Sequence, residues 1–221
     1  MSPENEDILV QLAKDVDGSY PRLWSMYTDR LYADVVQKIL NKEDARDIIQ
    51  DVFERVYRHL KSYPPERILK LQLDAWLYKI TKNACLKRKI YMLHEKILQT
   101  VTTVMIDALG VDEDEVAPEA TLLGDLGAES IDLLDILFRL ERKLGIKIQA
   151  SDITVHIQGG IPDEVFGDEN HIISAVGLAQ LKKAMPQINT DVLAGKLQAE
   201  KVLSLFTVGN LVNMYDAKAS V

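Results

Sequence analysis

The sequence contains a single cysteine, Cys85, so no disulfide bond can form within the chain. A chain without disulfides suits a reducing compartment, and we expect the protein to be cytoplasmic. The sequence also lacks any apolar run close to the roughly 18 residues of a membrane-spanning helix, so we expect no membrane insertion. Its acidic first residues, "MSPENEDILVQLAKD", lack the apolar core of a signal peptide.

Glycine and proline are both absent between Glu66 and Leu109. A flexible Gly/Ser linker is therefore excluded from this stretch. If two domains meet within it, we expect their junction to be helical or a tight bend.

Basic residues are scarce in the second part of the chain. Residues 1–95 hold 16 Lys and Arg against 15 Asp and Glu, a net charge of +1, whereas residues 96–221 hold 10 against 19, a net charge of −9. This asymmetry predicts two domains with different partners, at residues 1–93 and 94–221. The first domain tolerates contact with nucleic acid, and the second repels nucleic acid and attracts basic proteins.

Apolar residues make up 47% of the chain and recur at helical spacing, which predicts an all-α fold. We expect Pro21 in the first turn of a helix that continues to Ile39. Further helices are expected from Ala45 to Leu60, from Asp74, from Ile97 to Leu109, and over 130–144, about 172–185, about 190–205 and the last residues. Gly110 and Gly145 are expected to end two of them.

The stretch "GDLGAESIDLLDILFRLERKLGIKI" places a serine, Ser130, at the expected N-terminus of an amphipathic helix. The unpaired N–H groups and the positive dipole end of a helix stabilise an anion attached there. The acidic residues expected to face a basic partner are Glu129, Asp132, Asp135 and Glu141. The apolar residues expected to face inward are Ile131, Leu134, Leu137, Phe138 and Leu144. The simpler alternative is that Ser130 is only a helix N-cap.

Residues 95–148 and 207–218 resemble an acyl carrier protein. The resemblance rests on "EKILQTVTTVMIDALGV", "DEVAPEATLLGDLGAES", "SIDLLDILFRLERKLGIKI" and "TVGNLVNMYDA". It implies a four-helix bundle in which Ser130 carries 4′-phosphopantetheine, whose thiol tethers acyl groups. This chain has Glu129-Ser130-Ile131 where the family usually has Asp-Ser-Leu, and an apparent helical insertion at about 149–206.

The carrier resemblance also implies the partners. They are a phosphopantetheinyl transferase and acyl-transferring or synthase enzymes of fatty-acid or polyketide biosynthesis, which supply the chemistry, so the chain itself is not expected to be an enzyme. His156 and His171 lie in the insertion, but no ligand spacing there supports a metal site.

Residues 20–92 resemble the second conserved region of an extracytoplasmic-function RNA polymerase sigma factor, a module of three or four helices. The carrying stretches are "LYADVVQKILNKEDARDIIQDVFERVYRHLKSY" and "LDAWLYKITKNACLKRKI". The resemblance implies that Asp47, Gln50 and Phe53 contact the polymerase. It also implies that the next helix contacts melted promoter DNA, and Asn83 matches the family pattern there. Positive charges beside an aromatic ring suit single strands, so the other candidate contacts on this helix are Trp76, Lys79, Lys82, Lys87, Arg88 and Lys89.

A solvated lysine face and a core tryptophan explain the same residues without DNA. No helix-turn-helix follows the sigma-like stretch, because the carrier-like domain stands in its place. We therefore expect an acyl carrier protein fused to a sigma-like module. The alternatives are a sigma-type transcription initiation factor with an appended carrier domain, and an interaction protein with neither activity.

Overall fold

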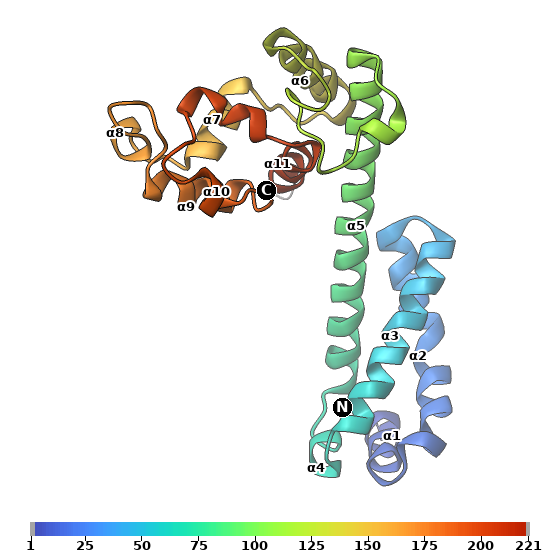
Figure 1. Cartoon of the computed structure of the whole chain (residues 1–221). Coiled ribbons are helices and arrows are strands. Elements are labelled where there is room, and N and C mark those ends of the chain that lie inside the picture. Colours follow the sequence, from blue (N-terminus) through green and yellow to red (C-terminus); the bar gives the residue numbers. More distant parts are fainter. Residues whose placement is uncertain (1–2, 220–221) are drawn as a thin grey trace. The chain divides into compact units, whose positions relative to one another are not determined.

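The computed structural model describes residues 3–219 as helices joined by turns and loops (Figure 1). These residues contain no β-strand, only isolated bridges such as Thr121–Thr207. The all-α prediction is confirmed. Backbone contacts divide the chain into an N-terminal unit, up to Met92, and a C-terminal unit, from Leu93. None of the described helices combines the length and apolarity that a bilayer crossing demands.

The N-terminal unit is built around one apolar core. It contains α1 (Pro3–Lys14), α2 (Val16–Ile39), α3 (Lys42–Ser62), α4 (Pro65–Ile68) and the first part of α5 (Leu73–Leu109). The helices α2 and α3 lie side by side (Figure 1), and all five helices contribute buried apolar residues to the core. The expected periodicity is realised in the pair, because Leu31 of α2 and Val56 of α3 are both fully buried.

The start of α2 differs from the sequence expectation. The helix begins at Val16, after Asp15, whose carboxylate accepts a hydrogen bond from the Gly18 N–H at 3.1 Å. Pro21 therefore lies inside the helix rather than in its first turn. The aspartate cap explains the earlier start, because its side chain satisfies an N–H group that the helix leaves unpaired.

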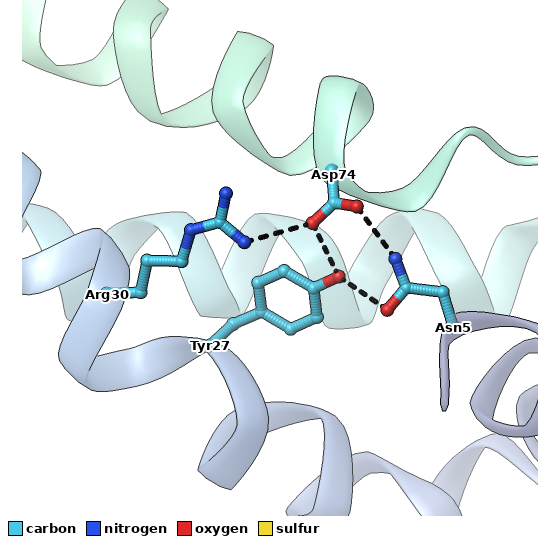
Figure 2. A network of polar contacts seen from close by, with 4 residues as sticks. All are labelled: Asn5, Tyr27, Arg30 and Asp74. Atoms are coloured by element: carbon cyan, nitrogen blue, oxygen red, sulfur yellow. Dashed lines mark hydrogen bonds and ion pairs between the residues drawn. The ribbon is translucent and has the colours of Figure 1, made fainter. Parts of the chain in front are cut away.

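A polar network joins three helices at one end of the N-terminal unit (Figure 2). The buried Tyr27 hydroxyl lies 2.9 Å from an oxygen of Asn5 and 2.9 Å from an oxygen of Asp74. The Asn5 side-chain N–H donates to the second Asp74 oxygen at 2.7 Å, and Arg30 approaches Asp74 to 3.4 Å. Asp74 lies in the first turn of α5, so the network holds the start of that helix against α1 and α2.

The C-terminal unit contains the last part of α5 and six further α-helices among the described residues. They are α6 (Ser130–Leu144), α7 (Ala150–Gln158), α8 (Asp163–Phe166), α9 (Ala175–Ala184), α10 (Thr190–Leu193) and α11 (Val208–Ala219), with short 3-10 turns at Glu113–Glu115, Ala199–Lys201 and Leu203–Leu205. Residues of the range 149–206, such as Ile153 and Leu181, belong to the same core as α5, α6 and α11. This range is therefore part of the packed unit.

The expected helix over 190–205 is wrong. Only Thr190–Leu193 is α-helical there, and Asn189 is its N-cap. Gly195 adopts a left-handed conformation, with φ of 70°, which breaks the helix. After it, the Leu197 carbonyl accepts a hydrogen bond from the Ile173 N–H at 2.8 Å, so tertiary pairing replaces the helical one.

Candidate functional site

The loop before α6 is fixed by backbone hydrogen bonds to the segment before α11. The Leu122 N–H donates to the Phe206 carbonyl at 3.0 Å, and the Val208 N–H donates to the Ala120 carbonyl at 2.9 Å. Within the loop, the Ala128 N–H donates to the Leu122 carbonyl at 3.0 Å. Ala128 is buried, so the chain two residues before Ser130 is anchored in the core.

A second turn stabilises the same loop. The carboxylate of Asp125 accepts hydrogen bonds from the backbone N–H and the hydroxyl of Thr121, both at 2.8 Å. These bonds lower the pKa of Asp125, which is therefore a carboxylate at neutral pH. Gly127, with φ of 66°, then turns the chain toward α6 in a conformation that favours glycine.

Ser130 is the first residue of α6, and Glu129 is the N-cap. The Glu129 N–H donates to the Asp132 carboxylate at 2.8 Å. The reading of Ser130 as a simple cap is therefore wrong. Its side chain is exposed, and no described residue forms a hydrogen bond with its hydroxyl. Backbone hydrogen bonding in α6 begins with the Leu133 N–H, which donates to the Glu129 carbonyl at 3.1 Å. The N–H groups of Ser130 and Ile131 have no backbone acceptor among the described residues.

The buried face of α6 differs from the expectation. The buried residues are Leu133, Ile136, Leu137 and Leu140, with Leu144 partly buried. Ile131, Leu134 and Phe138 were expected to face inward, but their side chains are 67%, 52% and 58% exposed. Their positions are separated from one another by three and four residues, so they share one face of the helix. We call these three residues the apolar stripe.

The acidic residues predicted around Ser130 do not form one uniform surface. Glu129 is exposed, while Asp132, Asp135 and Glu141 are half-buried. Asp132 is engaged with the backbone of the cap, and Asp135 forms an ion pair with Arg139 at 2.7 Å. The first half of α6 nevertheless keeps an acidic character next to the apolar stripe.

Comparison with known proteins identifies this region. The family described as "Phosphopantetheine attachment site" matches residues 99–156, which include Ser130. The acyl carrier protein of Thermotoga maritima is 41% identical over 59 residues, 27% of this chain and 73% of that protein. The acyl carrier protein of Rubrobacter xylanophilus is 46% identical over 57 residues, 26% of this chain and 70% of that protein. This chain belongs to the acyl carrier protein family. The family match reaches residue 156 and thus includes most of α7, at the start of the expected insertion.

A second family, "Sigma-70 region 2", matches residues 23–89 in the N-terminal unit. No solved structure matches the chain. The chain is thus a carrier domain joined to a sigma-like region, and its relatives identify a carrier protein rather than an enzyme. Its attachment-site domain indicates a covalent 4′-phosphopantetheine group. The described residues fit such a group, because an exposed and unbonded serine hydroxyl stands beside two N–H groups without backbone acceptors.

The three residues predicted to contact polymerase lie on α3 but differ in exposure. Asp47 and Gln50 are exposed, whereas Phe53 is fully buried. The Phe53 ring packs in the core against Trp24, with a centroid separation of 4.3 Å. The prediction that Phe53 presents its side chain to a partner is therefore wrong, because its aromatic ring is needed between α2 and α3.

The predicted nucleic-acid residues of α5 divide into three groups. Trp76, Lys79, Asn83 and Lys87 recur at three- and four-residue spacing on one face, and we call them the α5 strip. The two cations and the amide of this strip, Lys79, Lys87 and Asn83, are exposed, and Trp76 is half-buried. The exposed Lys82 and Lys89 lie roughly 100° away around the helix.

Arg88 does not belong with the other cations. It forms an ion pair with the buried Asp44 of α3, and its guanidinium lies 5.6 Å from the centroid of the Tyr91 ring. This pairing gives Arg88 a role in holding α5 to α3. A contact of Arg88 with DNA stays a prediction, and it would compete with this ion pair.

Sequence reasoning missed an aromatic cluster beside the α5 strip. The Trp76 ring lies 6.1 Å from His59 and 6.2 Å from Tyr63, measured between ring centroids. The Arg67 guanidinium lies 3.7 Å from the Tyr63 centroid. The two prolines in "SYPPER" indicate the end of a helix. The packing of Tyr63 against Trp76 is a tertiary contact, and the local sequence carries no signal for it.

Proposed function

We propose that this protein carries acyl groups as thioesters on a 4′-phosphopantetheine arm attached to Ser130. The observation that supports the proposal best is the exposed Ser130 hydroxyl, unbonded to any described residue, within the matched attachment-site stretch. The arm supplies a terminal thiol that forms thioesters. The chain supplies the attachment oxygen and the surface on which partner enzymes dock.

The attachment step uses only one atom of this chain. The Ser130 oxygen forms a bond to the phosphorus of the pantetheine phosphate of coenzyme A, and the bond from that phosphorus to the adenosine bisphosphate breaks. The serine proton passes to the transferase, which provides the base. The free N–H groups of Ser130 and Ile131, together with the helix dipole, then stabilise the phosphodiester anion.

Partner enzymes are proposed to dock on the apolar stripe. Ile131, Leu134 and Phe138 offer exposed apolar contacts, and the acidic first half of α6 attracts a basic rim on the partner. These partners are a phosphopantetheinyl transferase and acyl-transferring or synthase enzymes. Because coenzyme A and these enzymes work in the cytoplasm, we propose the same location for this chain.

Intact mass measurement tests the attachment. The full chain is incubated with coenzyme A and a broad-specificity phosphopantetheinyl transferase, and one added phosphopantetheine is expected. Ser130→Ala should gain nothing. Ser151→Ala is the matched control, because Ser151 is also an exposed serine in the first turn of a helix, and it should load as the native chain does. Full loading of Ser130→Ala would refute the assignment.

A second function, contact with RNA polymerase and single-stranded promoter DNA, is proposed for the N-terminal unit. It is favoured by the match to sigma-70 region 2 and by the exposed Asp47, Gln50 and α5 strip. Binding to core polymerase and to single-stranded DNA at two salt concentrations tests it. DNA binding that does not weaken as salt rises would exclude the phosphate contacts.

A further inference from the structure

The second half of α6 has the opposite charge to the first. Glu129, Asp132 and Asp135 give the first half a charge of −3. The second half holds Arg139, Glu141, Arg142 and Lys143, for a net charge of +2. The acidic character that the carrier function uses near Ser130 therefore ends about halfway along the helix.

Two of these cations already have partners. Arg139 pairs with Asp135 at 2.7 Å, and Lys143 lies 3.9 Å from Asp107 of α5. Arg142 forms no ion pair with a described residue, and its guanidinium lies 5.8 Å from the centroid of the Phe138 ring. Both side chains are exposed. Arg142 and Phe138 thus form a cationic and aromatic pair that the fold itself does not use.

The pair borders a groove between α5 and α6. Its volume is about 560 Å³, and its lining residues are Asp107, Asp135, Phe138, Arg139, Arg142 and Lys143. Cations near a helix C-terminus complement the helix dipole, which accounts for their presence on the last turns. The dipole does not account for a phenylalanine left 58% exposed beside one of them.

We propose that Arg142, together with Phe138 at the end of the apolar stripe, forms a second docking contact, which binds an acidic patch on the enzymes that use this carrier. The inference rests on the proposed carrier function and specifies its partners. A fitting enzyme has a cationic rim at its entrance, facing the residues around Ser130. Its acidic patch lies roughly 18 Å from that rim, because a helix rises by about this distance over the twelve residues from Ser130 to Arg142.

The consequence is selectivity. An enzyme whose docking face is cationic throughout places a positive charge against Arg142, and like charges at an interface are unfavourable. An enzyme with an acidic patch at that position gains an ion pair and a contact with the Phe138 ring. The charge reversal along α6 thus discriminates between partner enzymes by their surface charge.

The test uses a purified carrier-dependent β-ketoacyl synthase whose docking face holds only lysine and arginine. In a variant of this synthase, two cations about 18 Å from its entrance are replaced by glutamate. The native chain, loaded with the arm, should show a kcat/KM roughly tenfold higher with the glutamate variant than with the parent. Arg142→Glu should reverse that preference, and Phe138→Ala should reduce it. Lys183→Glu, an equal charge change on an exposed residue of α9, should preserve it.

Direct binding of the unloaded chain to both synthases should give the same ranking. This measurement separates the two proposals, because it does not require attachment at Ser130. Binding that is equal for both synthases, absent for both, or unaffected by Arg142→Glu overturns the second docking contact. Failure of the transferase to load the chain overturns the carrier function instead.

Discussion

Two leucines of α6 provide a direct comparison of its buried and exposed faces. Leu140 is fully buried, whereas Leu134 is 52% exposed. A Leu→Ala change at a fully buried site costs about 2–5 kcal/mol, through lost transfer free energy and the cavity left behind. At Leu134 about half of the side chain is already in water, so we expect a cost of about 1 kcal/mol or less.

Hydrogen exchange measured on α6 and α11 is the suitable assay, because both tryptophans, Trp24 and Trp76, lie in the N-terminal unit and do not report on this one. The expected cost for Leu140→Ala corresponds to exchange of the most protected amides that is roughly 30-fold to 4,000-fold faster. Leu134→Ala should accelerate it about fivefold at most.

The same pair separates stability from function. Leu134→Ala should slow loading by the transferase although the unit stays folded, because the apolar stripe loses one of its contacts. Equal acceleration of exchange by the two changes would refute the assignment of the faces, and so would normal loading of a stable Leu134→Ala chain.

Three further predictions concern other parts of the chain. Burial and the hydrogen bond to Asp74 raise the pKa of Tyr27 to about 12, so its contribution to stability is complete below about pH 10 and is lost as pH rises toward 12. Tyr27→Phe should cost about 1–3 kcal/mol at neutral pH, and this difference should shrink over that range, as measured by urea unfolding followed by tryptophan fluorescence. Alanine at both Lys79 and Lys87 should weaken single-stranded DNA binding and reduce its logarithmic salt slope by about 1.4, for two phosphate contacts. Tyr215→Phe should leave the C-terminal unit as stable or about 1 kcal/mol more stable, since the buried Tyr215 hydroxyl has no hydrogen-bond partner among the described residues.

Matched changes check these predictions. Alanine at Lys82 and Lys89, off the α5 strip, should affect DNA binding less than the change at Lys79 and Lys87 does. A Tyr27→Phe difference that stays constant up to pH 12 would contradict the role of the network in Figure 2. A loss of stability in Tyr215→Phe, seen in hydrogen exchange of α11, would show that its hydroxyl is satisfied.

Helix ends were predictable because their signals are local. Gly110 and Gly145 follow their helices in the left-handed conformation, with φ of 71° and 70°, as glycine at a helix end permits. The start of α2 was misplaced because two local signals compete there. Asp15 caps the helix, while Pro21 resembles a first-turn proline but lies six residues inside.

The sequence does carry a signal for the buried face of α6. The helix carries two apolar sets. Leu133, Ile136, Leu140 and Leu144 continue through about three turns, whereas the set that begins at Ile131 ends at Phe138 after about two. The longer set is the buried one. The pairing of Arg88 with Asp44, in contrast, joins residues 44 positions apart and carries no local pattern. It became visible only with α3 and α5 in contact.

The central claim is tested most directly by locating the modification within the chain. After incubation with coenzyme A and the transferase, the protein is digested and the peptide that contains Ser130 is fragmented in a mass spectrometer. The account predicts a single phosphopantetheine on the Ser130 oxygen. An arm located on any other residue, or an unmodified Ser130 in folded protein beside a carrier that loads under the same conditions, would contradict it.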